Sequence, residues 1–321
     1  MTPRAVVALL LVTLAAVTTS HAQPADRKTV AVLTPSAAQW REEAFRGALR
    51  SLGYVEGVNV VFDIRSADGH LERLPELARA VVRRGVDVIV GVNMPSMRAA
   101  LAASKSVPIV MAMVGDPVRL GLVASLARPG GTVTGVSNMS GELAAKRLEL
   151  LREVAPHARR IALLYHPDEA IVPPQVEDLE AKGHTLGLQF RMIAVRGEAD
   201  LERAFDAAAA WPADAVLRLA GQASTVGAQT ARLALKRRLP AMMFTRRDVE
   251  AGGLMAYYID EDEAFRRVAH YVDQILKGAA PRDLPVEQPT RFELAINLRT
   301  ARALRLTVPP SLLLRANHVI E

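Results

Sequence analysis

Cysteine is absent from the 321 residues, and aromatic residues make up only 4% of them. Without cysteine the chain forms no disulfide, no thiolate metal site and no lipid-anchored N-terminal cysteine. With so few aromatic residues, the core must consist mainly of Ala, Val, Leu and Ile. Hydrophobic residues reach 50%, which is enough for a sizeable core, and the length favours two domains.

Motifs that would indicate catalysis or metal binding are also missing. The histidines are scattered, with neither HExxH nor HxH spacing. There is no GxSxG elbow, no P-loop and no GxGxxG after the first predicted strand. Ser36 and Ser96 follow predicted strands but have no obvious histidine partner. These absences favour a binding protein over an enzyme, and they predict neither a metal nor a cofactor.

Charge of both signs is spread along the chain, although the formal net charge is +6. No basic block and no interleaving of basic with aromatic residues is present, so a nucleic-acid partner is not expected. The arginines on predicted helices are best interpreted as a solvated surface.

The N-terminal 22 residues have the pattern of a secretory signal peptide. Arg4 precedes an apolar run, residues 5–17, and Ser20-His21-Ala22 supplies a small-x-small cleavage site. The run is too short to favour a membrane span. The prediction is therefore a cleaved signal at 1–22 and an exported, soluble protein, located in the periplasm if the source is a bacterium.

Strand and helix patterns alternate along the rest of the chain, twice over. The first round of predicted strands covers 29–33, 59–65, 86–92 and 107–113, and the second covers 160–165, 189–194, 213–219, 241–244 and 254–258. Amphipathic segments between them predict helices at 40–52, 71–83, 93–103, 142–154, 176–186, 200–210 and 222–237. Such alternation indicates βαβ crossovers and parallel sheets with both faces covered, here in two α/β lobes with a seam near 135–142.

The stretch 114–137 is the best candidate for a functional edge. Gly115-Asp116-Pro117 breaks the strand at 107–113, residues 120–126 predict one short helix, and a further strand follows at 132–136. Ligands of open parallel sheets bind at the loops after the strands' carboxyl ends. Asp116 either contacts a ligand there, most naturally its amino group, or caps the turn.

At three other positions the sequence also leaves open whether the side chain contacts a ligand. His166 lies at a strand end and either faces a cleft or lies on the surface. Arg246 and Arg247 either clamp a carboxylate or are simply solvated. Tyr257 and Tyr258 alternate on a strand, so only one of them is expected to face a cleft.

Six strings in order along the chain resemble one family, the ABC-transporter substrate-binding proteins of the tryptophan/tyrosine type. They are GYVEG (53–57), DGHLERLPELA (68–78), GDPVRLGLVASLARPGG (115–131), ELAAKRLELLRE (142–153), VEAGGLMAY (249–257) and QPTRFELAINLRTA (288–301). The resemblance covers essentially the whole chain after the predicted signal.

The resemblance implies a type I periplasmic binding fold, with two α/β lobes joined by crossover strands and a small molecule held between them. The first lobe would comprise 28–137 and about 255–280, and the second 138–254 and about 281–321. It also implies delivery of the ligand to an ABC permease at the inner membrane. A monomer is expected, because such a receptor must dock and release. Strand ends and helix N-termini would supply the ligand contacts, namely Thr34, Ser36, Asn93, Ser96, Asp116, Asn138, His166, Gln222, Arg246 and Tyr257.

The chain departs from the family pattern at three places. Relatives often carry Asn-Pro-x-Asn-Pro where this chain has Tyr165-His166-Pro167-Asp168, and Ser-Tyr-Gly where it has Ala256-Tyr257-Tyr258. They also tend to place an aromatic cluster where residues 220–224 read AGQAS. Ring stacking would be a main source of affinity for an aromatic ligand, so this last change weakens the case for one.

The function predicted from the sequence is a periplasmic receptor that captures an amino acid or small organic acid for an ABC importer. Two alternatives remain open: a ligand-binding partner of a membrane sensor kinase, and a secreted enzyme on a two-lobed frame. A DNA-binding regulator is disfavoured, because an export signal stands where a helix-turn-helix would be needed.

Overall fold

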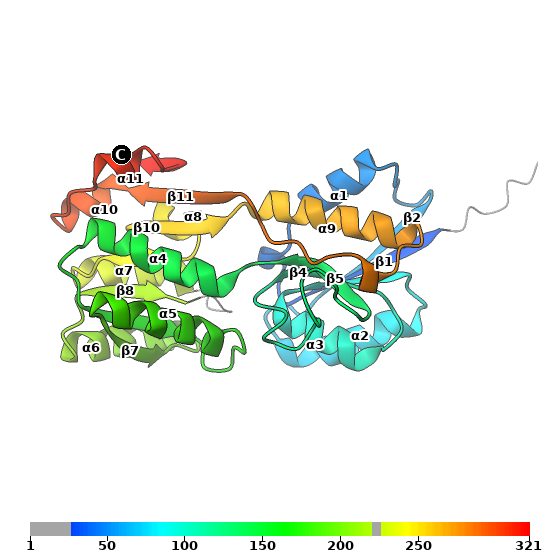
Figure 1. The fold of residues 1–321 in the computed structure, drawn as a ribbon, viewed down its shortest axis with the longest axis horizontal. Coiled ribbons are helices and arrows are strands. Elements are labelled where there is room, and N and C mark those ends of the chain that lie inside the picture. Colours follow the sequence, from blue (N-terminus) through cyan, green and yellow to red (C-terminus); the bar gives the residue numbers. More distant parts are fainter. Residues whose placement is uncertain (1–26, 220–225) are drawn as a thin grey trace, which may run out of the picture.

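Two α/β lobes lie side by side in the computed structural model, which describes residues 27–219 and 226–321 (Figure 1). The first lobe is built on a five-stranded sheet and the second on a seven-stranded sheet. The fold class predicted from strand–helix alternation is therefore confirmed. The predicted signal peptide at 1–22 and the candidate residue Gln222 lie outside the described residues.

The first sheet is parallel throughout, with the order β2-β1-β3-β4-β5. Its strands are β1 (Lys28–Thr34), β2 (Val60–Ser66), β3 (Val88–Val92), β4 (Ile109–Val114) and β5 (Val133–Ser137). Helices α1 (Glu42–Ser51) and α9 (Glu261–Leu276) cover one face, and α2 (Leu74–Arg83) and α3 (Asn93–Ala103) cover the other. In β1, Val32 faces the first pair and Leu33 the second, which is why the strand reads as an unbroken apolar run.

The second sheet repeats the first and extends it. Strands β6 (Arg160–Tyr165), β7 (Gln189–Ala194), β8 (Ala215–Arg218), β9 (Ala241–Met243) and β10 (Met255–Ile259) are parallel and have the same order as the strands of the first sheet. Strand β11 (Phe292–Asn297) then pairs antiparallel with β10, and β12 (His318–Ile320) lies beside β11. The helices of this lobe are α4 (Ser140–Val154), α5 (Val172–Leu186), α6 (Leu201–Ala210), α7 (Gly227–Lys236), α8 (Arg246–Glu250), α10 (Leu298–Ala303) and α11 (Pro310–Leu313).

The chain crosses between the lobes three times. It leaves the first sheet after β5 and enters α4, and it returns between β10 and α9, whose Phe265 packs edge-on against Trp40 at 5.1 Å between ring centroids (Figure 1). The segment after α9 then bonds to the edge of the first sheet, where the Glu287 N–H donates to the Gly135 carbonyl at 2.9 Å. From there it passes into β11. Three separate connections make a hinge between the lobes.

Two details differ from the sequence predictions. Residues 120–126 form turns instead of a helix, because Gly121 takes a left-handed conformation (φ +71°) that ends helical winding. The strand at 255–259, predicted to begin the return to the first lobe, pairs in the second sheet, so this crossing comes after Ile259. None of the helices within 27–219 and 226–321 is long and apolar enough to cross a membrane.

Candidate functional site

A cleft of about 470 Å³ opens between the two lobes, where the carboxyl ends of both sheets meet. Residues that directly follow the strands line it from both sides: Ser36 after β1, Asn93 after β3, Gly115 after β4, Asn138 after β5, Glu169 and Ile171 after β6, and Phe244 to Asp248 after β9. Parallel strands end at one edge of a sheet, so two such sheets facing each other produce this arrangement.

The cleft walls are largely apolar, with charged groups at defined places. Apolar side chains from both lobes contribute, namely Met94, Met113, Leu143, Ile171, Phe244, Ile259 and Phe265. Charged residues line it as well, namely Arg41, Arg147, Glu169, Arg246, Arg247, Asp248, Asp260, Glu261, Asp262 and Glu293. An apolar pocket with a few oriented polar groups is the usual form of a small-molecule site.

Four of the predicted site residues line this cleft: Ser36, Asn93, Asn138 and Arg246. The Asn93 amide donates to Gln39 at 3.1 Å, and the Asn138 amide donates to the Met113 carbonyl at 3.0 Å. Each bond uses one of the two N–H donors of its amide and does not use the amide oxygen. Arg246 is held by Glu250 of its own helix at 2.7 Å.

Five predicted residues lie near the cleft but are not among its lining residues. Thr34 and Ser96 are buried behind it, and the Thr34 hydroxyl donates to the Ser36 carbonyl. Asp116 accepts the Arg119 backbone N–H at 3.1 Å and so caps the turn. His166 is next to Asp168, and Tyr257 stacks on Phe292 at 5.7 Å between centroids. In the alternating pair it is Tyr258 that faces the cleft.

Arg147 is the cleft residue that sequence reasoning missed most completely. It lies on α4 within a helical pattern whose other basic residues are exposed or half-buried, yet its side chain is only 1% exposed. Its Nε–H donates to the Tyr257 carbonyl at 2.7 Å, and its guanidinium lies over the Phe244 ring at 4.5 Å. Burial, and then the neighbouring Arg218, lower the pKa of Arg147 to about 9.

Acidic groups on the same cleft are already engaged. Asp248 accepts from Arg218 at 3.1 Å and from the Thr245 backbone N–H at 3.0 Å. Burial raises the pKa of Glu261 above its usual range, while its ion pair with Arg41 opposes that shift. Burial and the nearby Glu293 raise the pKa of Tyr258 as well, so its hydroxyl stays protonated at neutral pH.

Two contacts connect the lobes beside the cleft. Arg119, in the loop after β4, donates through Nη1 to both Asp178 oxygens at 3.1 and 3.2 Å and pairs with Glu177, both on α5 of the second lobe. A Cβ added to Gly115 would lie 2.1 Å from Ile171 Cδ1, so the backbone of one lobe touches a side chain of the other. Both contacts require the lobes to be close together.

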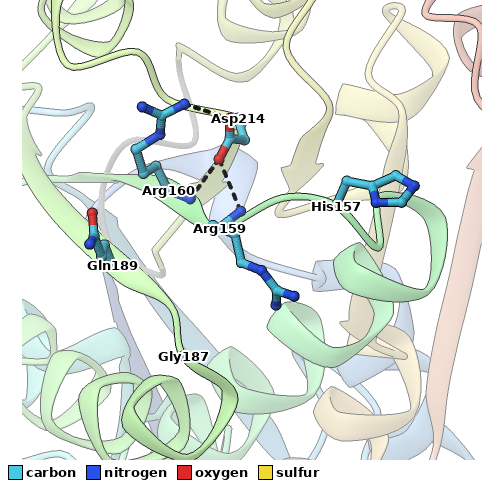
Figure 2. Close-up of a pocket in the computed structure, with 6 residues that line it drawn as sticks. All are labelled: His157, Arg159, Arg160, Gly187, Gln189 and Asp214. Carbon is cyan, nitrogen blue, oxygen red and sulfur yellow. Dashed lines mark hydrogen bonds and ion pairs between the residues drawn. The ribbon is translucent and has the colours of Figure 1, made fainter.

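A second depression, of about 550 Å³, lies at the opposite end of the second sheet (Figure 2). Asp214 accepts there from the backbone N–H groups of Arg159 and Arg160 at 2.9 and 2.8 Å and from the Arg160 guanidinium at 3.1 Å. Figure 2 shows the His157 and Arg159 side chains pointing away from Asp214. The carboxylate of Asp214 therefore joins the starts of two strands and is satisfied by its neighbours. Across the described residues, no group of three or more His, Asp or Glu side chains is placed to hold a metal ion.

Comparison with known proteins connects the cleft to a family. A family model described as ABC transporter substrate binding protein matches residues 29–320. A tyrosine-binding protein of Clostridioides difficile (strain R20291) is 27% identical over 276 residues, which are 82% of this chain and 76% of the relative.

Solved structures agree. The structure of an ABC domain from Streptococcus pneumoniae in complex with L-Trp has a TM-score of 0.82 and 26% identity, and covers 92% of this chain and 100% of that one. A conserved domain protein from Vibrio cholerae has a TM-score of 0.83 and 29% identity, with 91% and 99% covered. The leucine-binding protein LivK of Thermotoga maritima, at 17% identity and a TM-score of 0.57, shares the fold, with 80% and 78% covered. With two similar lobes, a cleft between them and a family match along nearly its whole length, this chain belongs to the ABC transporter substrate-binding proteins and has the type I periplasmic binding fold.

Proposed function

We propose that this protein captures an amino acid or small organic acid between its lobes in the periplasm and delivers it to an ABC importer of the inner membrane. The observation that carries the proposal is the cleft itself, which is apolar in most of its walls, charged at defined points and formed by both lobes. The relatives named above, one a tyrosine-binding protein and one solved with L-Trp, support an amino acid as the ligand.

The aromatic lining of the cleft favours an amino acid with a large apolar side chain. Phe244 and Tyr258 from the second lobe and Phe265 from the first line the cleft. These rings line the cleft although residues 220–224 lack the aromatic cluster that relatives tend to have. An apolar side chain buried among them gains affinity from both area and ring contact.

Binding would act by shifting an open–closed equilibrium. A ligand held by both walls binds the closed form more tightly than the open form, and it shifts the population by that difference in affinity. Contacts such as Arg119 to Asp178 exist only with the lobes together and add to the stability of the closed form. The closed monomer then presents one surface to the permease, with no enzymatic step.

The test is a ligand screen on the mature chain, residues 23–321, by thermal shift and then calorimetry. A ligand present at 100 times its dissociation constant adds about 2.7 kcal/mol to the stability of the folded form, which raises the melting temperature by a few degrees. We expect a clear shift with one or more amino acids with apolar side chains. Absence of any shift across amino acids and small carboxylates would contradict the proposed ligand class.

Delivery is tested separately, by uptake of the labelled ligand in cells that lack the gene. Loss of uptake, restored by the intact gene, is the expected result. Normal uptake without the protein would count against the importer role and favour the sensor-kinase alternative.

A further inference from the structure

The wall of the cleft contains a buried cation with a free hydrogen-bonding position. Arg147 is 1% exposed and lines the cleft, and its Nη1 has no hydrogen-bond partner among the described residues. Buried guanidinium groups are normally paired with carboxylates, because removing the charge from water is unfavourable. An unsatisfied charged group at a cleft wall therefore requires an explanation.

No carboxylate within residues 27–219 and 226–321 pairs with this cation. Besides burial, the neighbouring cation Arg218 lowers the pKa of Arg147, and Tyr257 opposes that shift. Asp248, the carboxylate beside Arg218, already accepts from that guanidinium and from the backbone N–H groups of Phe244 and Thr245. These three bonds all end on Asp248 Oδ2, and the structure shows no ion pair between Arg147 and a carboxylate of the described residues.

Two contacts fix how the guanidinium is presented. The Nε–H bond to the Tyr257 carbonyl holds one edge of the planar group, and the Phe244 ring lies against its face at 4.5 Å. Held in this way, the group is pre-oriented, so little side-chain entropy is lost when an anion binds. A planar guanidinium with fixed orientation is well suited to a carboxylate.

We infer that Arg147 is the anchor for a ligand carboxylate, so that the ligands of this protein are carboxylates bound with that group against the Arg147–Phe244 wall of the second lobe. This inference rests on the proposed function and names the group by which the cleft recognises its ligand. Arg246, the arginine predicted from the sequence to clamp a carboxylate, is instead held by Glu250 in an exposed ion pair.

The decisive experiment compares a carboxylate with its neutral amide. Affinities for L-tyrosine and L-tyrosinamide, with L-tryptophan and its amide as a second pair, are measured by calorimetry on the wild type, Arg147→Gln and Arg147→Lys. Wild type should prefer each amino acid to its amide. Arg147→Gln should lose roughly 10- to 100-fold for the amino acids and far less for the amides, because a hydrogen bond to a charged group is lost only with the former. The affinity of Arg147→Lys for the amino acids should lie between those of the wild type and Arg147→Gln, because lysine keeps the charge but lacks the planar guanidinium.

A second measurement does not depend on which amino acid binds. Sodium acetate, compared with sodium chloride at the same ionic strength, should raise the melting temperature of the ligand-free wild type more than that of Arg147→Gln. The melting temperature of Arg147→Gln without ligand should not fall far, because the variant removes a buried charge that lacks a partner. Arg160→Gln, in the hollow of Figure 2, is the control and should show the ligand affinities and the acetate-induced shift of the wild type, although its own melting temperature is expected to be lower.

The outcomes separate the two claims. Equal loss for acids and amides, or an acetate response unchanged in Arg147→Gln, would overturn the anchor while leaving the receptor function intact. If acetate stabilises the wild type more than Arg147→Gln but no amino acid of the screen binds, Arg147 is supported as a carboxylate anchor. The same result would contradict the proposal that the ligand is an amino acid.

Discussion

The second lobe has two arginine-bearing depressions, at opposite ends of its sheet, and they differ in how the arginines are paired. In the hollow of Figure 2, Asp214 joins the starts of two strands and its guanidinium partner, Arg160, is partly exposed. In the cleft, Arg147 is fully buried, and its Nη1 has no hydrogen-bond partner in the described parts of the chain. The two depressions therefore differ in their buried polar groups: Asp214 is satisfied by its neighbours, whereas the cleft contains a buried group without a hydrogen-bond partner among the described residues.

If the cleft is the binding site, the largest loss of ligand affinity is expected from a substitution of Gly115. Its backbone in the first lobe touches Ile171 of the second lobe. In Gly115→Val the new side chain would overlap Ile171 and the Ser140 hydroxyl, so the closed form is penalised and ligand affinity should fall by more than about tenfold. Gly131→Val on the same loop is the matched control, because a Cβ there meets nothing within 4 Å. Calorimetry measures the ligand affinities. Small-angle X-ray scattering measures how far apart the two lobes lie with and without ligand. Equal affinity in both variants would show that this contact does not limit closure.

A smaller effect is expected at the ion pair between the lobes. Arg119→Gln removes the bonds to Asp178 and Glu177 and should weaken ligand binding by about two- to fivefold, because exposed ion pairs contribute little each. High salt should reduce the difference between wild type and variant. Arg315→Gln is the control, since Arg315 makes a similar bidentate pair with Glu153 inside the second lobe. Equal effects of the two variants would exclude a special role for the pair between lobes.

A substitution in the hollow of Figure 2 is expected to leave ligand binding unchanged and to affect only stability. Burial by itself raises the pKa of Asp214, but hydrogen bonds from the Arg160 side chain and the Arg160 and Arg159 backbone hold that pKa below its usual range. Ionised Asp214 therefore adds to the free energy of unfolding above a pH of about 4. This contribution is lost as the pH falls through the lowered pKa of Asp214.

Asp214→Asn should thus lower the free energy of unfolding by about 1 kcal/mol at pH 7, by less in acid, and leave ligand affinity unchanged. Urea unfolding at several pH values measures the first part, and calorimetry measures the second. Altered affinity would mean that the hollow and the cleft are coupled.

Much of the fold follows from local patterns that the sequence carries openly. The apolar run of β1 and the amphipathic α4 each correspond to an element of the structure, because burial on both faces or on one stripe dictates residue periodicity. The helix expected at 120–126 was wrong, because the left-handed Gly121 within it outweighed the apolar spacing.

The sequence predicted where the candidate site lies but only some of the residues that line it. Ser36, Asn93, Asn138 and Arg246 line the cleft because they follow strand ends, a position that can be read from the sequence. Asp116 also follows a strand, yet its carboxylate turns back to its own loop. Strand ends identify loops, but the direction in which each side chain points depends on bonds inside the loop.

By itself, the sequence determined two α/β lobes with mostly parallel sheets, the sheet edges that line the cleft and the family to which the chain belongs. The tertiary structure alone decided that Arg147 is the buried cation of the cleft. In the sequence, Arg147 is one of three basic residues of α4, and its spacing from Leu143 and Leu151 places it on the apolar stripe without showing which segments cover it. Its burial depends on Phe244 and Tyr257, about 100 residues further along the chain, which reach it only after β10 and α4 have packed together. Periodicity reports the geometry of one segment, whereas the burial and pairing of a charge are set by segments that the chain brings together from afar.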